Sequence, residues 1–153
     1  MAIEQNIRLS LFSEITDAES GEREREERVL SAVLREKDGC RLLSYTETGE
    51  GGDVRSELFC TDGRVRLRRT GDVRSEILFS EGTVHSSLYE IPPYRFDMTV
   101  TTESLHCFFG ATDGEIDLAY TAVIGGVGRH CRLTLRIAAW PSVRKETPWN
   151  RRN

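Results

Sequence analysis

Hydrophobic and polar residues alternate with a period of two along most of the chain, which is typical of β-strands with one buried face. In the segment 7–15, Ile7, Leu9 and Leu11 share one face, while Arg8 and Ser10 lie on the other. Similar alternation or strand-forming runs follow in segments 54–60, 64–69, 73–79, 83–89, 96–101, 105–109, 116–124 and 131–137. No strand–helix–strand pattern appears, so a parallel sheet is not expected. The pattern predicts about ten short strands in an antiparallel barrel or sandwich.

Short turn signals separate these segments. Tight turns are predicted at Asp62-Gly63, Gly71-Asp72, Glu81-Gly82 and Asp113-Gly114, and a hairpin at Gly125-Gly126-Val127-Gly128. Pro92-Pro93 has no N–H groups to donate to a ladder, so it marks a corner or an edge of the sheet.

The charged segment 22–28 is compatible with either a helix or a strand. Glu24 and Arg28 are spaced for contact on a helix. In a strand, the glutamates at 22, 24 and 26 would share one face and the arginines at 23 and 25 the other. The run 29–34 continues with strand-forming apolar residues, so a strand is favoured, with the charges forming a solvated edge.

Length and composition predict one domain. The 153 residues, with 38% hydrophobic and 30% charged residues, can bury one core. We expect a single barrel domain over residues 1–140, followed by a polar, weakly ordered tail over 141–153. No apolar run approaches the roughly 20 residues of a membrane helix, and no signal-peptide pattern is present. The four cysteines are far apart, so a cytoplasmic protein with reduced thiols is expected.

Little in the sequence indicates catalysis or a metal. The pairs His106-Cys107 and His130-Cys131 cannot chelate as units, because adjacent strand residues point to opposite faces. The chain has three histidines and no nucleophile elbow or phosphate-binding loop. We therefore expect no metal and no cofactor, and favour a role other than that of an enzyme.

Arginine supplies nearly all of the positive charge, in a chain with a net charge of −4. The negative total argues against a dedicated nucleic-acid binder. Arg64, Arg66 and Arg68 nevertheless share one face of a strand. This face is either a solvated surface, with Glu57 and Glu76 pairing across the ladder, or a surface for RNA or another anionic ligand.

Charged residues also occur on faces that the pattern predicts to be internal. Arg69 shares the face of Val65 and Leu67, and Glu47 shares the face of Tyr45. Because a buried charge is costly unless paired, a bidentate Arg69–Glu47 contact is predicted. It is either an internal ion pair near the barrel rim or the polar anchor of a ligand pocket.

The motifs Leu43-Ser44-Tyr45-Thr46-Glu47 and Arg69-Thr70-Gly71-Asp72-Val73, with Phe79 ending the next strand, resemble the YwiB-like family of bacterial proteins. The order of Tyr89, Asp113-Gly114 and Tyr120 is also similar. Ala32 and Tyr94 stand where that family tends to have glycine. The resemblance covers about Ile7 to Ala139 and implies a calycin-like (lipocalin-like) antiparallel β-barrel of eight to ten strands, with no assigned activity.

These observations favour a barrel that binds a small anionic or amphipathic ligand, with Tyr45, Glu47, Arg69 and Tyr120 as candidate ligand-binding residues. One alternative is an RNA- or phosphate-binding surface on Arg64, Arg66 and Arg68, assisted by the tail residues Arg151 and Arg152. Another is a barrel filled by its own side chains that acts as a protein-interaction module. A homodimer that forms through hairpin edges or through the tail is a further alternative.

Overall fold

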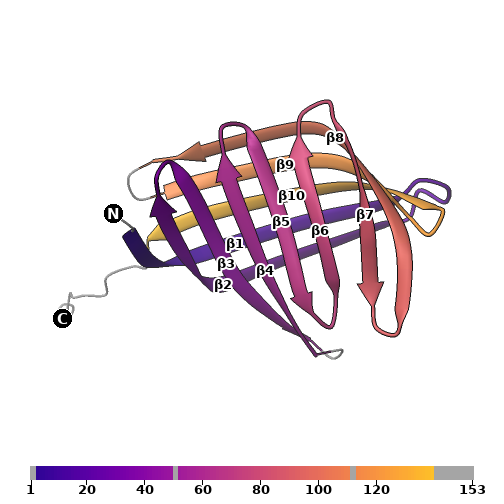
Figure 1. Cartoon of the computed structure of the whole chain (residues 1–153), viewed down its shortest axis with the longest axis horizontal. Helices are drawn as coiled ribbons and strands as arrows, with labels where there is room; N and C mark the ends of the chain where they lie inside the picture. Colours follow the sequence, from indigo (N-terminus) through magenta and orange to yellow (C-terminus); the bar gives the residue numbers. More distant parts are fainter. Residues whose placement is uncertain (1–2, 50–51, 111–112, 140–153) are drawn as a thin grey trace, which may run out of the picture.

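The computed structural model describes residues 3–49, 52–110 and 113–139, and its regular elements are ten β-strands (Figure 1). They are β1 (Ile3–Asp17), β2 (Arg23–Lys37), β3 (Cys40–Gly49), β4 (Gly52–Thr61), β5 (Arg64–Gly71), β6 (Arg74–Ser80), β7 (Val84–Ile91), β8 (Tyr94–Phe109), β9 (Asp113–Ile124) and β10 (Val127–Ala139). Within these ranges no helix is long and apolar enough to cross a membrane. The predicted tail lies outside the described residues.

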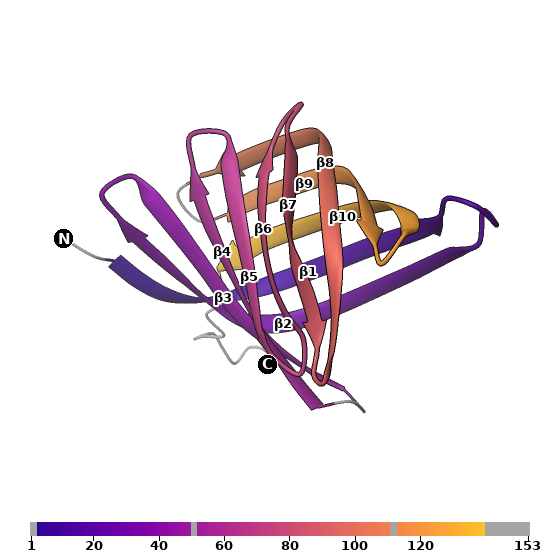
Figure 2. The same ribbon diagram turned by 45° about the vertical axis from the view of Figure 1, so that its right-hand side comes forward.

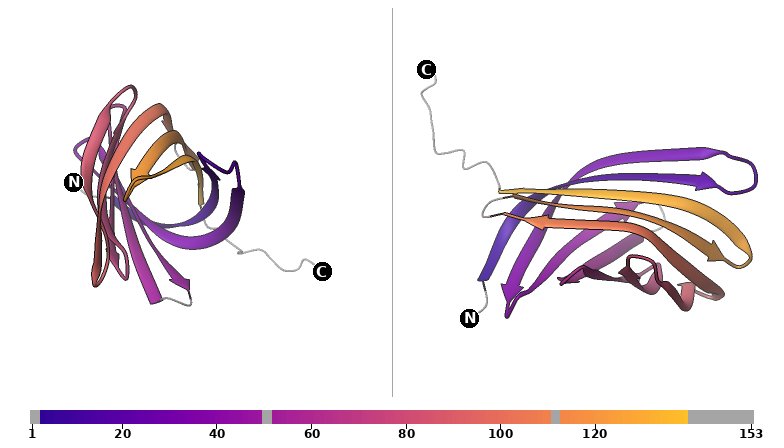
Figure 3. Two further views of the ribbon diagram at one scale, coloured as in Figure 1. Left: turned by 90° about the vertical axis from the view of Figure 1, so that its right-hand side faces the viewer. Right: turned by 90° about the horizontal axis from the view of Figure 1, so that it is seen from above.

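The strands form a closed antiparallel barrel. Each strand pairs with the next along the chain, and β1 pairs with β10 to close the ring. Seen end-on, the strands encircle a common axis (Figure 3). The fold is a calycin-like β-barrel, which confirms the fold class predicted from the alternating pattern.

Two of the seams in the ring are only partly paired. β2 and β3 pair through residues 33–37 and 40–44 alone. β6 and β7 pair at two positions, Arg74 with Glu90 and Ser75 with Tyr89. The β6–β7 seam is unpaired next to the β6–β7 turn, because its two pairs adjoin the β5–β6 and β7–β8 turns. The β2–β3 seam is unpaired at the other end of the barrel, which carries the β1–β2, β3–β4, β5–β6, β7–β8 and β9–β10 turns and where the β1–β2 hairpin projects beyond its neighbours (Figure 2). We call this open end the mouth.

Apolar side chains fill the barrel away from the mouth. The apolar side chains with no exposed surface come from seven of the ten strands and are Ile7, Leu9, Leu43, Leu58, Val65, Leu67, Phe79, Ile116, Leu118 and Leu135. Their alternation with exposed residues is what the period of two predicts. This half of the barrel is therefore packed, and the question of a hollow interior concerns the mouth only.

Three local predictions can be compared with the strands. Residue 22 of the charged segment precedes β2, and residues 23–28 are its first residues. The strand favoured over a helix for this segment is therefore confirmed. Residues 96–101 and 105–109 are not two strands, because β8 continues through both and absorbs the change of face in an irregularity between Thr102 and Ser104. The turn predicted at Thr112-Asp113-Gly114 lies earlier in the chain: Asp113 and Gly114 are paired in β9, the Gly110 N–H donates to the Asp113 carbonyl at 2.8 Å, and Thr112 is outside the described residues.

The turn at Gly71 depends on glycine. Its φ is +109°, and a Cβ there would collide with the carbonyl oxygen of Asp53 on β4. Because both the backbone angle and the close approach exclude a side chain, Gly71→Ala is expected to lower the free energy of unfolding by about 2–3 kcal/mol. Urea unfolding measures this loss. Gly82→Ala is the matched control, because φ is also positive there but a Cβ would meet no atom within 4 Å. Equal losses in the two variants would contradict the role of the Asp53 contact.

Cys60 makes the fold sensitive to alkaline pH. Burial, with smaller contributions from the nearby Cys107 and Cys40, raises the pKa of its thiol to about 12. In the unfolded chain the thiol ionises near pH 8.5, so the stabilising effect is complete below about pH 8.5 and is lost as the pH rises toward 12. We expect the free energy of unfolding to fall by about 1.4 kcal/mol per pH unit in this window because of Cys60 alone. Cys60→Ala should show a slope shallower by one proton in urea titrations at pH 8–10; an unchanged slope would refute this assignment.

Candidate functional site

Inward-facing residues of β3 to β6 form layers whose chemistry changes toward the mouth. The layer below the cavity is apolar, because Leu43, Leu58, Leu67 and Ile77 lie side by side across the four strands. All four are buried. This layer forms the floor on which the polar residues nearer the mouth stand.

The next layer is polar. Strand register places Tyr45, Ser56, Arg69, Ser75 and Tyr89 beside one another on β3 to β7. We call these five residues the polar row. Neighbouring strands are about 4.8 Å apart, so each side chain of the row lies beside the next. Three hydroxyl groups and one guanidinium are thereby brought together inside the barrel, together with the half-buried Tyr89.

The hydroxyl groups of the polar row are poorly satisfied. Ser56 is fully buried, and Tyr45 and Ser75 are 3% and 8% exposed. The Tyr45 Oη, Ser56 Oγ and Ser75 Oγ atoms have no hydrogen-bond partner among the described residues. A buried polar group without a partner costs about 1–3 kcal/mol. Of the polar row, Arg69 and Tyr89 line the cavity described below, and the three hydroxyl groups lie buried behind them.

The third layer, at the rim, contains Glu47, Val54 and Gly71. The Glu47 carboxylate pairs with Arg28 of β2, with Nη1 and Oε2 3.4 Å apart. Arg28 also contacts Glu26 at 2.9 Å. These contacts bridge the part of the β2–β3 seam that has no backbone pairing.

The predicted Arg69–Glu47 contact is therefore wrong. Glu47 is in register with Gly71 and Tyr45 with Arg69, so the two charged residues occupy different layers and are separated by β4. No carboxylate of the described residues forms an ion pair with Arg69 within 4.0 Å, and Arg28 takes the predicted place of Arg69 beside Glu47.

A cavity of about 490 Å³ opens from the polar row to the mouth. Its polar walls come from Arg28, Glu47, Arg69, Asp72 and Tyr120, and its apolar walls include Leu11, Ile15, Val54, Val73, Ile91 and Leu133. The volume lies within the usual range of about 300–1,000 Å³ for small-molecule sites.

Among the arginines that line this cavity, Arg69 differs from the other two. Arg28 is paired with Glu26 and Glu47, and Arg132 is paired with Asp117 at 2.9 Å. Arg69 lies one layer deeper than the rim, between two serines. Of these three arginines, Arg69 is the one that forms no ion pair with a carboxylate of the described residues.

Two tyrosines from opposite walls share the field of Arg69. Burial raises the pKa of Tyr45 and of Tyr120, and the nearby Arg69 charge counteracts this rise in both. The Tyr120 ring packs on Phe79, with ring centroids 4.8 Å apart, which connects the cavity to the core. Both phenols remain protonated at neutral pH, so they are available as hydrogen-bond donors beside the guanidinium.

The structure thus brings Tyr45, Arg69 and Tyr120 together, with Glu47 at the rim. Sequence analysis missed Arg28, Ser56, Ser75 and Tyr89. The signal for Arg28 was present, because it shares the even-numbered face of β2 with Leu30 and Ala32. The serines carried no signal, since their proximity to Arg69 depends on the pairing register.

The lining of the cavity combines charged and polar side chains with apolar ones. Arg69 and the hydroxyl groups can hold an anionic group, and the apolar walls nearer the mouth can contact an alkyl or aromatic part. Among the described residues there is no group of three or more His, Cys, Asp or Glu side chains that could hold a metal ion. No described histidine lines this cavity.

The second predicted set, Arg64, Arg66 and Arg68, lies exposed on the outside of β5. Arg68 contacts Glu57 at 3.0 Å and Arg66 contacts Glu76 at 3.7 Å. These are the cross-strand pairs expected from the sequence. The outer surface is therefore separate from the cavity.

Comparisons with known proteins agree with the architecture. The structure is similar to the crystal structure of the ywiB protein from Bacillus subtilis, with a TM-score of 0.80 and 24% sequence identity over 89% of this chain and 92% of that chain. A search of curated proteins found no match. Residues 10–135 match the family model described as a domain of unknown function, DUF1934. The resemblance noted from the sequence motifs is confirmed, and the chain belongs to the DUF1934 family.

Proposed function

We propose that this protein is a non-catalytic carrier or sensor that holds a small anionic amphiphile in the mouth of its barrel. The observation that carries the proposal is the position of Arg69, an inward-facing cation without a carboxylate partner among the described residues, beside buried hydroxyl groups that also lack partners. A carboxylate or phosphate group would satisfy both at once.

The layers of the cavity define the ligand further. The anionic group binds at the level of Arg69, Ser56 and Ser75, above the apolar floor. The apolar part extends toward the mouth, along side chains such as Ile15 and Val54. The 490 Å³ volume accommodates a molecule with a short chain or one or two rings rather than a long lipid.

A barrel filled entirely by its own side chains is the competing possibility. The buried apolar residues support it for the end away from the mouth. The cavity, the incomplete β2–β3 seam and the unsatisfied hydroxyl groups favour ligand binding at the other end. The two descriptions therefore apply to different halves of one barrel.

The test compares ligands that differ only in charge. Isothermal titration calorimetry with octyl phosphate, octanoate and octanol on the full chain separates the contribution of the anionic group from that of the alkyl chain. A hydrogen bond to a charged group is worth about 1.5–3 kcal/mol, so the anions should bind at least about tenfold more tightly than octanol. Equal affinities for the two anions and octanol would show that Arg69 does not bind an anionic group. If none of the three compounds binds, the cavity does not bind amphiphiles of this kind. Native mass spectrometry of the purified protein would identify a ligand that copurifies.

A further inference from the structure

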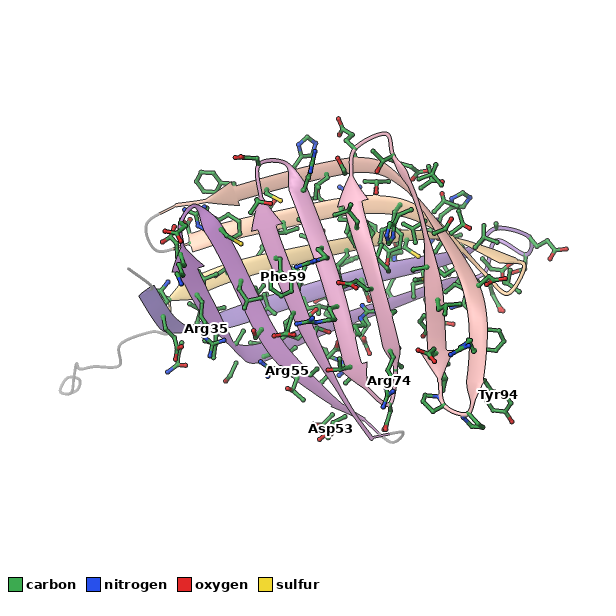
Figure 4. All side chains as sticks on the ribbon, viewed as in Figure 1. Arg35, Asp53, Arg55, Phe59, Arg74 and Tyr94 are labelled. Atoms are coloured by element: carbon green, nitrogen blue, oxygen red, sulfur yellow. The ribbon has the colours of Figure 1, made fainter. Side chains whose placement is uncertain are left out.

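The outer surface of β4, β5 and β6 carries an excess of positive charge. Five arginines lie there, Arg55, Arg64, Arg66, Arg68 and Arg74, against three carboxylates, Asp53, Glu57 and Glu76. We call these five arginines the arginine face. Figure 4 shows Arg55, Phe59 and Arg74 on this side of the barrel. An excess of cations here contrasts with the net charge of −4 for the whole chain.

Ion pairing leaves part of this charge free. Arg55 and Arg68 share the single carboxylate of Glu57, at 3.8 and 3.0 Å. Arg66 pairs loosely with Glu76 at 3.7 Å. In the described part of the chain, no carboxylate lies within 4.0 Å of the guanidinium groups of Arg64 and Arg74. Exposed pairs of this geometry are weak, so an incoming anion can compete for these guanidinium groups.

The outside of β9 and β10 provides an internal comparison. There Arg132 pairs with Asp117 at 2.9 Å and Arg136 with Glu115 at 3.2 Å, one carboxylate to each arginine. That surface is neutralised locally, although its two arginines are more exposed than Arg66 and Arg68. The arginine face therefore differs from the outside of β9 and β10, where each of the two arginines has its own carboxylate.

An aromatic ring lies within the arginine face. The guanidinium groups of Arg66 and Arg68 lie 4.7 and 5.5 Å from the centre of the Phe59 ring. Beside it, a hollow of about 540 Å³ is lined by Phe59, Arg64, Arg66, Leu78 and His85, among others. The hollow runs along the β6–β7 seam, where β6 lacks its ladder partner and the Leu78 N–H donates to His85 Nδ1 at 3.3 Å.

We propose that the arginine face binds single-stranded RNA. Guanidinium groups bind phosphates, and a flat surface of stacked guanidinium and aromatic groups is suited to stacking against unpaired bases. The hollow beside Phe59 is large enough for one base, with Leu78 and the ring as apolar contacts. An acidic polypeptide would use the same arginines but would gain nothing from Phe59, which is why a nucleic acid is favoured. This surface is independent of the cavity at the mouth.

Fluorescence anisotropy with a labelled oligouridine of about 12 nucleotides tests the proposal, since sites of this kind span about 4–16 nucleotides. The double variant R64Q/R66Q should weaken binding at least about tenfold and reduce the dependence of log K on log salt by about 1.4. The matched control, R132Q/R136Q, also removes two exposed arginines and should change affinity less than about twofold. Equal losses in both double variants would mean general charge attraction and overturn a defined site, as would negligible binding at low salt.

Two further measurements separate RNA from an acidic protein segment. Phe59→Leu keeps every charge and should weaken oligouridine binding several-fold, whereas polyglutamate of matched charge should compete poorly. Unchanged RNA affinity in Phe59→Leu together with effective competition by polyglutamate would replace the RNA proposal with an acidic partner. Arg69→Met should leave oligouridine binding unchanged, so failure of the RNA proposal and failure of ligand binding in the mouth are distinguishable.

Discussion

Replacing Arg69 by methionine is expected to abolish the preference for octyl phosphate over octanol without destabilising the protein. Arg69 forms no ion pair with the described carboxylates, so its removal breaks no salt bridge and removes a partly buried charge. Methionine has a similar length and packs against the neighbouring apolar layer. We expect the affinity for octyl phosphate to fall about 10- to 100-fold, and the free energy of unfolding to stay within about 1 kcal/mol of the native value or to rise.

Calorimetry and urea unfolding of the same preparations measure the two quantities. Arg28→Met is the matched control, because Arg28 also lines the cavity but is already paired with Glu26 and Glu47. Its effect on octyl phosphate binding should be small. If Arg69→Met instead lowers stability by several kcal/mol and leaves the ligand preference intact, Arg69 is a structural residue and the proposed anion site is wrong.

The second large effect is expected from Phe79→Ala, which should remove a large part of the stability of the barrel. Phe79 has no exposed surface and packs on Tyr120, so its loss leaves a void between the core and the wall of the cavity. Truncation of a buried phenylalanine to alanine typically costs about 3–5 kcal/mol. A domain of this size has a total stability of about 5–15 kcal/mol, so a clear fall in melting temperature should accompany the change.

Thermal and urea unfolding monitored by circular dichroism test this prediction. Leu78→Ala, at the adjacent position on the outer face, is the control, since Leu78 is 37% exposed and its removal should cost much less. Phe79→Leu should fall between the two variants, because it keeps part of the buried volume. Similar losses for Phe79→Ala and Leu78→Ala would show that Phe79 is not part of the tightly packed core.

Much of the fold could be predicted because the strands have one apolar and one polar face. The alternation in segments such as 7–15 and 116–124 is visible in the sequence, and the turn residues Asp62-Gly63 and Gly125-Gly126 mark the hairpins between strands. The errors occurred where tertiary pairing overrides a local signal. Asp113-Gly114 has the composition of a turn, yet it is paired on both sides, with β8 and with β10.

The candidate site was predictable in composition but not in its contacts. That Arg69 and Tyr45 face inward follows from their place in the alternating pattern. The ion partner of Glu47 did not follow, because Arg28 reaches it across the unpaired part of the β2–β3 seam. Strand register, which is set by pairing between segments distant in sequence, decides which side chains occupy one layer.

The sequence by itself determined the strands, their buried faces, the family motifs and the presence of charged residues on inward faces. Only the tertiary structure decided that Ser56 and Ser75 flank Arg69, that Glu47 lies one layer nearer the rim, and that two seams are incomplete. The physical reason is that the period of two is a property of each strand alone. The layers of a barrel depend on the stagger between neighbouring strands, and closure fixes that stagger for the whole ring at once.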